Sequence, residues 1–163
     1  MAGTYNIQFY PDRFKRNTSG ISRPACSLWF AACSLLLLSC TGKDHKQATK
    51  FEQYYVQGQT LYVTHCSNCH QKNGTGLGLL YPPLNTSDFM DNHFEEVICL
   101  IKKGKEGELL VNGKQFNKPM KGILSLTELE VAEITTYIYN TWDHKRGIVE
   151  IKEVTSALAT CSD

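Results

Sequence analysis

The sequence predicts an all-α domain of three to four short helices and long loops, placed behind an N-terminal targeting segment. Three stretches carry apolar residues at helical spacing, namely residues 51–66, 91–103 and 127–142. A loop rich in glycine and proline separates the first two, and residues 51–163 contain no internal repeat. Three short helices bury little surface in a segment of this length, so we expect something besides side chains to fill the centre.

Length and charge exclude several classes of protein. The 163 residues suit one domain. The formal net charge is +1, but residues 1–40 hold four basic residues and one acidic residue, which leaves 13 basic and 15 acidic residues in 41–163. We therefore expect no binding to nucleic acid, because a slightly acidic domain does not attract a polyanion. The seven cysteines are many for this length and need separate explanations.

The N-terminal segment has the order of a secretory signal peptide. Basic residues up to Arg23 precede an apolar run, Leu28–Leu38. This run is too short to span a bilayer, which needs about 20 residues. It ends in Leu37-Leu38-Ser39-Cys40, which resembles the lipobox of bacterial lipoproteins, where the cysteine is acylated and becomes the mature N-terminus. We expect a lipoprotein signal peptide over residues 1–39 and lipidation of Cys40. An ordinary signal peptide, a buried helix and cleavage before Cys33 are the alternatives.

The segment after the lipobox predicts a tether. Residues 40–50 are polar and aperiodic, which favours a flexible, lipid-anchored link between the membrane and the domain. The lipid anchor implies an exported protein of the cell envelope that faces the periplasm or the outer surface. Such a compartment tolerates disulfide bonds.

Two helical stretches and a hairpin follow. The first stretch, 51–66, has large and small residues at spacings of three and four: Phe51, Tyr54, Tyr55, Gly58, Leu61, Tyr62 and His65. The second stretch, 91–103, has one apolar face and ends at Gly104. The dipeptide Asn112-Gly113 lies between two short pairs of strand-forming residues and predicts the turn of a hairpin over residues 108–116.

The strongest helical pattern covers residues 127–142. Thr127 and Glu130 form the pattern of a capping box at its start. The remaining residues, 143–163, predict a C-terminal extension that packs on the domain as a helix or tail. Its apolar residues for this contact are Ile148, Ile151, Val154 and Leu158. The predicted domain therefore covers residues 51–142.

The motif Cys66-Ser67-Asn68-Cys69-His70 carries the chemistry. It is the C-x-x-C-H attachment signature of c-type haem. Two thiols on one tight turn reach the two vinyl groups on one edge of the porphyrin and form thioethers, and the adjacent His70 gives a nitrogen to the iron. A chain of this composition contains the motif by chance only about 0.01 times.

Three other interpretations use the same cysteines. A zinc site would combine Cys66, Cys69 and His70 with His65 or His93, but a second cysteine pair at metal spacing is missing. A thioredoxin-like redox pair needs a βαβ context, whereas the predicted flanks are a helix and a loop. A plain structural disulfide is the third alternative.

Residues 51–142 resemble a class I, mono-haem cytochrome c domain. Gly58 and Tyr62 match the small residue and the aromatic residue of the family's N-terminal helix. Tyr137 matches the aromatic residue of the C-terminal helix on which that helix packs. The resemblance implies a cytochrome c-like fold around one covalently bound haem c with its iron, and a small hairpin before the distal ligand.

The resemblance also implies a partner for His70. The sequence Tyr81-Pro82-Pro83-Leu84 resembles the family's loop after the haem site, in which a proline carbonyl accepts a hydrogen bond from the proximal histidine. Such a bond fixes the ring and raises its basicity. Both prolines are candidates, and we select Pro83.

Met120 is the predicted sixth ligand of the iron. As in the family, it lies far along the chain from His70 and just before the capped helix. Met90 and a second histidine, His93, are the alternatives. A thioether stabilises ferrous iron and so raises the reduction potential relative to a second histidine. Lys121 departs from the family, in which proline often follows the ligand methionine.

The resemblance implies a single-electron carrier with His70 and Met120 as axial ligands, rather than an enzyme. Its partners would be redox proteins, as donor and acceptor. Two alternatives keep the same haem: an electron-entry subunit of a larger oxidase, reductase or dehydrogenase, and a haem peroxidase or ligand sensor. The sequence shows no distal Arg/His pair at peroxidase-like spacing.

Two further features concern the surface. Segment 99–121 contains six lysines, which we expect to rim the exposed haem edge and attract an acidic partner, with an ordinary solvated surface as the alternative. Cys99 and Cys161 either form a disulfide or remain a buried and an exposed thiol.

Overall fold

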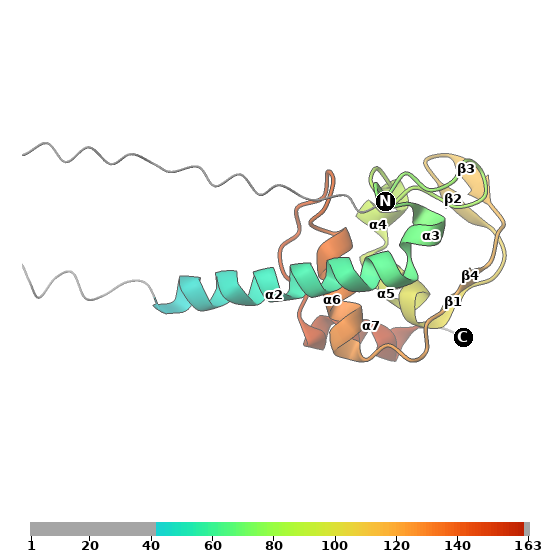
Figure 1. The fold of residues 1–163 in the computed structure, drawn as a ribbon. Helices are drawn as coiled ribbons and strands as arrows, with labels where there is room; N and C mark the ends of the chain where they lie inside the picture. Colours follow the sequence, from blue (N-terminus) through green and yellow to red (C-terminus); the bar gives the residue numbers. More distant parts are fainter. Residues whose placement is uncertain (1–41, 162–163) are drawn as a thin grey trace, which may run out of the picture. The chain divides into compact units, whose positions relative to one another are not determined.

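A computed structural model describes residues 42–161 as a helical domain with two small strand pairs (Figure 1). The helices are α2 (Gly42–His65), α3 (Ser67–His70), α4 (Asp88–Asn92), α5 (Phe94–Lys103), α6 (Glu128–Ile138) and α7 (Ile151–Thr160). The predicted all-α class, with long loops and a small hairpin, is confirmed. The predicted signal peptide, 1–39, and Cys40 lie outside the described residues. No helix within the described range is long and apolar enough to cross a membrane.

The strands form two antiparallel pairs. β2 (Leu109–Val111) pairs with β3 (Lys114–Phe116) in the predicted hairpin. Its turn residues Asn112 and Gly113 have φ of 52° and 70°, as the tight hairpin turn requires. The second pair, β1 (Gly104–Lys105) with β4 (Met120–Lys121), joins segments far apart in sequence.

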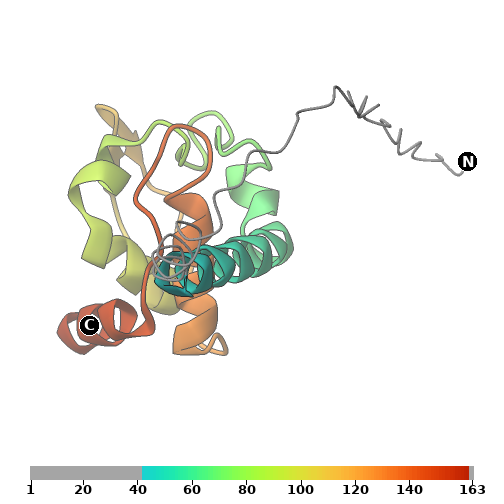
Figure 2. The ribbon, with the colours of Figure 1, turned by 90° about the vertical axis from the view of Figure 1, so that its left-hand side faces the viewer.

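Helices α2 and α6 pack closely across each other, as Figures 1 and 2 show. A Cβ atom at Gly58 would lie 2.0 Å from the carbonyl oxygen of Glu133, so only glycine allows this approach. One turn further, the rings of Tyr62 and Tyr137 lie 5.4 Å apart. The contact that the resemblance implies for Gly58, Tyr62 and Tyr137 is therefore present.

Helix α6 begins as predicted and ends earlier. The Thr127 hydroxyl accepts a hydrogen bond from the Glu130 backbone, and the Glu130 side chain accepts one from the Thr127 backbone. The helix ends at Ile138 because the chain turns back, so the predicted end at Trp142 is wrong. Trp142 has φ of 59°, and its ring packs on Gly74, where a Cβ atom would lie only 2.7 Å from the ring.

The second predicted helix is split in two. The expected helix over 91–103 is the end of α4 followed by α5, with a break at His93. Ser87 caps α4 by accepting a hydrogen bond from the Met90 backbone, 3.2 Å long. The break turns the apolar face of α5 inward, where it buries Val97, Ile98, Leu100 and Ile101.

The predicted flexible tether differs from the structure. Residues 42–50 form the first turns of α2, whereas the sequence pattern predicted no regular structure there. Residues 45–49 are all exposed, so this part of the helix has no apolar face and its sequence shows no apolar residues at helical spacing. An existing helix extends without a new nucleation cost, and no proline stops it. Lys50 then anchors α2 through an ion pair with Glu150, 2.6 Å long.

The C-terminal extension packs against the domain through α7. Val149 and Val154 are fully buried in this contact with α5 and α6. Cys99 in α5 and Cys161 at the end of α7 form a disulfide with a Cα–Cα distance of 5.7 Å. Of the two alternatives for these cysteines, the structure contains the disulfide.

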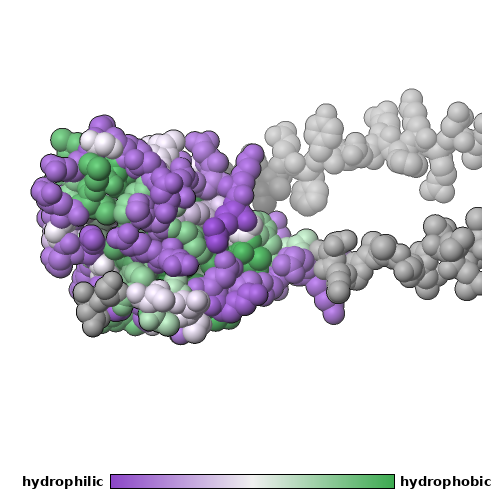
Figure 3. Space-filling model, turned by 180° about the vertical axis from the view of Figure 1, so that it is seen from behind, coloured by the Kyte–Doolittle hydropathy of each residue, from purple (hydrophilic) through white to green (hydrophobic). Residues whose placement is uncertain are grey.

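The surface is mostly polar, with exposed leucines in a few places. Figure 3 shows a polar face with an apolar area at the end away from the start of α2. The exposed leucines of the described chain include Leu77, Leu79 and Leu80 after α3, Leu110 in β2 and Leu124 after β4. They lie in or beside the loops that surround the candidate site.

Candidate haem site

The C-x-x-C-H motif forms one wall of the site on a single turn. α2 ends at His65, and the backbone N–H groups of Cys69 and His70 both donate to the Cys66 carbonyl, at 3.1 and 3.0 Å. This short helix, α3, puts two thiols and one imidazole on the same local unit. Within the described chain, Cys66 and Cys69 are the two cysteines outside a disulfide.

His70 is buried and held in one orientation. Its Nδ1 lies 3.0 Å from the carbonyl oxygen of Pro82. A carbonyl only accepts hydrogen bonds, so Nδ1 carries the proton and Nε2 keeps its lone pair. Burial lowers the pKa of His70, and the bond to Pro82 partly opposes this shift. The neutral imidazole with a free Nε2 is the form that binds a metal.

The prediction that Pro83 orients His70 is wrong, because Pro82 provides the carbonyl. The loop is fixed by a close approach at Gly76, where a Cβ atom would lie 2.2 Å from the Tyr81 carbonyl oxygen and 2.6 Å from that of Pro82. The Leu77 N–H donates to the Tyr81 carbonyl as well, at 3.0 Å. These contacts decide which of two consecutive proline carbonyls faces His70.

Met120 forms the opposite wall, and its position depends on the pairing of its strand, β4. β4 pairs with β1, with Lys105 opposite Met120 and Gly104 opposite Lys121. A Cβ atom at Gly104 would lie 2.4 Å from the Met120 carbonyl oxygen, and one at Gly122 would lie 2.2 Å from the Lys103 carbonyl carbon. Two glycines thus let the Met120 segment lie directly against the end of α5.

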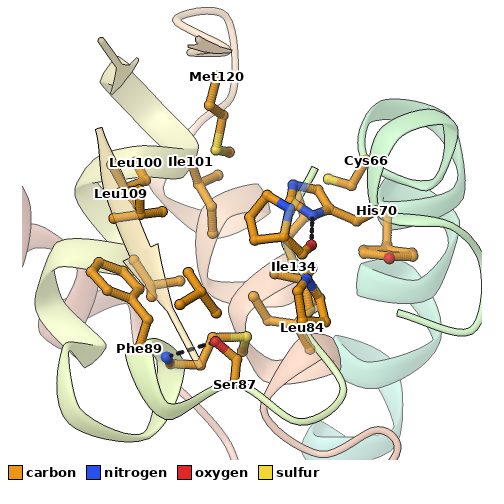
Figure 4. Close-up of a pocket in the computed structure, with 17 residues that line it drawn as sticks. Cys66, His70, Leu84, Ser87, Phe89, Leu100, Ile101, Leu109, Met120 and Ile134 are labelled. Carbon is orange, nitrogen blue, oxygen red and sulfur yellow. Dashed lines mark hydrogen bonds between the residues drawn. The ribbon is translucent and has the colours of Figure 1, made fainter. Parts of the chain in front are cut away.

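Both walls face one pocket (Figure 4). Cys66 and His70 enter it from one side and Met120 from the other. The cavity between the lining side chains has a volume of about 70 Å³, and the adjoining space that shares Cys66, His70 and Met120 has about 290 Å³. The apolar residues that line it include Leu84, Phe89, Met90, Leu100, Ile101, Leu109 and Ile134.

The donor set of this pocket fits haem c. Thiols that attach the porphyrin, an imidazole nitrogen and a thioether sulfur are the groups that c-type haem uses. Burial, followed by the charge of Cys69, raises the pKa of the Cys66 thiol to about 12 as long as no haem is attached to it. The apolar walls match the apolar faces of a porphyrin, as the expectation of a filled centre requires.

A second space continues the pocket toward solvent. It shares Cys66, His70 and Met120 with the first and adds Cys69 and Tyr81. Of the six lysines singled out in the sequence, Lys105, Lys118 and Lys121 line this opening. A basic rim therefore borders the open side of the site.

The alternative ligands occupy different positions. Met90 is buried and lines the same pocket, so it stays an alternative to Met120. His93 is half-exposed, stacks on Phe89 and pairs with Glu96 at 3.5 Å, away from the pocket. His65 lines the open side.

The structure does not support the zinc alternative. In residues 42–161, no three side chains of His, Cys, Asp or Glu lie close enough together to hold a metal ion.

The residues that position the candidate ligands were not predicted from the sequence. Gly76, Gly104 and Gly122 make their contacts with segments distant in sequence or in adjacent loops, and a glycine alone does not reveal them.

Comparison with known proteins agrees with this geometry. Two proteins named cytochrome c-552, from Thermus thermophilus and from a strain of that species, are each 26% identical to this chain over 105 residues. The aligned part is 62% of this chain, and 79% and 70% of the two relatives. The sequence model of the family described as Cytochrome c matches residues 55–142, which include the motif and Met120. The chain therefore belongs to the cytochrome c family and is a c-type cytochrome that carries covalently bound haem c with its iron.

Proposed function

We propose that this electron carrier transfers single electrons between redox proteins with His70 and Met120 as the axial ligands of its haem iron. The observation that supports this proposal is that Cys66, His70 and Met120 line one apolar pocket, while Cys69 lines the space that adjoins it. Cys66 and Cys69 hold the haem, and His70 offers Nε2. The bound haem supplies an iron that alternates between the ferrous and ferric states.

The surroundings of the pocket favour electron transfer over catalysis. With His70 and Met120 as its ligands, the haem iron would have no coordination site left for a substrate. The Met120 segment is tied to the end of α5 by β1–β4, so its side chain is held near the pocket. Apolar walls exclude water, and the thioether favours the ferrous state.

The basic rim supports docking of an acidic redox partner. Lys105, Lys118 and Lys121 border the opening through which Cys69 is reached. Opposite charges on two partners raise the rate of encounter and orient it, and salt weakens the effect. We infer that electrons enter and leave through this opening.

We also propose that the protein is anchored in the cell envelope by a lipid on Cys40. The lipobox-like sequence before Cys40 supports the anchor, and the Cys99–Cys161 disulfide suits an exported protein. The full chain, expressed in a bacterium, should appear in the membrane fraction with an acylated N-terminus. The Cys40→Ala variant should lose the acyl mass. An unmodified wild-type Cys40 would contradict the anchor.

The proposed electron transfer is tested on residues 43–163, exported together with the haem-attachment machinery. We expect an intact mass increased by one haem, low-spin spectra in both redox states, and a reversible titration that fits one electron. A high-spin ferric spectrum, with rapid binding of cyanide or turnover of peroxide, would contradict it and favour a sensor or peroxidase.

A further inference from the structure

The residue after His70 has a backbone conformation that residues other than glycine rarely adopt. Gln71 has φ of 64° and ψ of 157° and ends α3. This region is essentially reserved for glycine, and another residue stays there only when its surroundings hold it. The peptide that follows the proposed iron ligand is therefore under strain.

Two donors hold the carbonyl of Gln71. The Tyr62 hydroxyl donates to it at 2.6 Å, and the Gly74 backbone N–H donates at 3.1 Å. The Gln71 side chain adds a bond to the Asn68 carbonyl at 3.3 Å. Of these contacts, only that of Tyr62 comes from outside the 66–76 segment, so it is the one that ties the Gln71 backbone to another part of the domain.

The hydroxyl of Tyr62 is itself fixed by the helix crossing. Tyr62 is fully buried, and its ring lies 5.4 Å from the ring of Tyr137 and 5.7 Å from that of Trp142. Burial raises the pKa of Tyr62 above its ordinary value, so the phenol is protonated and can donate at neutral pH. Tyr62 also lines the pocket that His70 faces.

We propose that Tyr62 is a positioning residue for His70, and that it acts by holding the strained Gln71 backbone. The packing of α2 on α6 sets the hydroxyl, the hydroxyl sets the Gln71 carbonyl, and this carbonyl sets the peptide that leaves His70. Pro82 fixes the other end of the same residue through Nδ1. The inference rests on the proposed ligation of iron by His70.

The first test compares two tyrosine variants of the holoprotein. Tyr62→Phe keeps the ring and removes the hydroxyl. Tyr55→Phe is the matched control, because Tyr55 lies in the same helix, packs on Tyr137 at 5.2 Å, and bonds to Thr141 rather than to Gln71. We expect Tyr62→Phe to keep the haem mass but to shift the haem methyl resonances of the oxidised protein and the reduction potential. Tyr55→Phe should leave both at their wild-type values.

The second test removes the strain. Glycine adopts the backbone conformation of residue 71 without strain, so in a Gln71→Gly background the Tyr62 hydroxyl is no longer needed to hold it. There we expect Tyr62→Phe to produce less than half of its shift in the methyl resonances. Gln71→Ala also loses the side-chain amide but keeps the backbone strain. In this background Tyr62→Phe should produce its full shift in the methyl resonances. If Tyr62→Phe alone yields no holoprotein, adding Gln71→Gly should restore the yield.

Three results would overturn the proposal: wild-type resonances and potential in Tyr62→Phe with only a lower melting temperature, equal shifts in both backgrounds, or no recovery of holoprotein by Gln71→Gly. Failure of the proposed function looks different. It would appear in the wild-type protein as a spectrum without histidine ligation, before any Tyr62 variant is measured.

Discussion

The two walls of the haem pocket are held in different ways. On the side of His70, the thiols and the imidazole lie within five consecutive residues, on one turn built by local hydrogen bonds. On the side of Met120, the proposed ligand lies in a two-residue strand whose partner, β1, is 15 residues or more away in sequence. One wall is therefore specified by its own segment and the other by tertiary contacts.

The wall that contains Met120 has little local structure of its own and is held by several long-range contacts. Besides β1–β4, the Lys102 amine donates to the carbonyls of Leu124 and Leu126, which follow the Met120 strand. The disulfide from Cys99 to Cys161 ties the same helix, α5, to the C-terminal extension. Damage to the β1–β4 pairing or to the Lys102 hydrogen bonds should affect the Met120 side and leave the His70 side intact.

The largest expected effect comes from removing the proximal thiols. Cys66→Ala with Cys69→Ala should abolish covalent haem and leave an unfilled apolar pocket, so the domain should fail to fold stably. Intact mass and circular dichroism measure both losses. Cys99→Ala with Cys161→Ala, the other cysteine pair, should keep the haem mass. Equal haem loss in both variants would contradict the assignment of the thiols.

Removing the disulfide should cost stability without altering the site. Its cysteines are 62 residues apart, and for a loop of this length the chain-entropy treatment gives about 4 kcal/mol. Cys99→Ala with Cys161→Ala should therefore unfold at a lower denaturant concentration, while the absorption spectrum in water is unchanged. A changed spectrum would mean that the disulfide, through α5, sets the position of Met120.

A smaller and more local effect is expected at Gly122. The added Cβ of Gly122→Ala would lie 2.2 Å from the Lys103 carbonyl carbon, so β4 must move away from α5. Overpacking of this kind costs about 1–3 kcal/mol. We expect a weaker methionine-to-iron absorption band and unchanged haem attachment. Gly107→Ala is the control for an added Cβ without a clash, because no atom lies within 4 Å of the new Cβ. Its φ of 79° adds a backbone strain that Gly122 does not have, so the control is the stricter one.

The smallest effect concerns the rim of the opening. Lys118→Glu with Lys121→Glu should slow electron exchange with an acidic redox protein several-fold at low ionic strength, with spectrum and stability unchanged. Raising the ionic strength should remove the difference. Lys152→Glu in α7 is the control, because it reverses the charge of an exposed residue outside the opening and should leave the rate of electron exchange unchanged. Stopped-flow rates that fall equally in both variants would contradict docking at the rim.

Sequence patterns predicted the parts of the molecule that are locally encoded. The attachment motif, the Thr127–Glu130 cap and the Asn112-Gly113 turn each depend on residues a few positions apart, and the structure contains all three elements. The family resemblance added the packing of Gly58 and Tyr62 on α6.

The features that sequence patterns missed depend on contacts between distant segments or on solvent-exposed residues. Nothing local distinguishes the carbonyls of Pro82 and Pro83, and the contact at Gly76 decides between them. The strand pair that carries Met120 is too short for a hydropathy pattern. Residues 45–49 extend α2 without any apolar face, so they were predicted as a tether.

The identity of the distal ligand is the central claim, because Met120 and Met90 both line the pocket. Its most direct test is the methionine-to-ferric-iron absorption band, recorded for the oxidised holoprotein and for two volume-conserving variants, Met120→Leu and Met90→Leu. The account predicts that the band disappears in Met120→Leu and stays in Met90→Leu. A band that survives in Met120→Leu and disappears in Met90→Leu would contradict it.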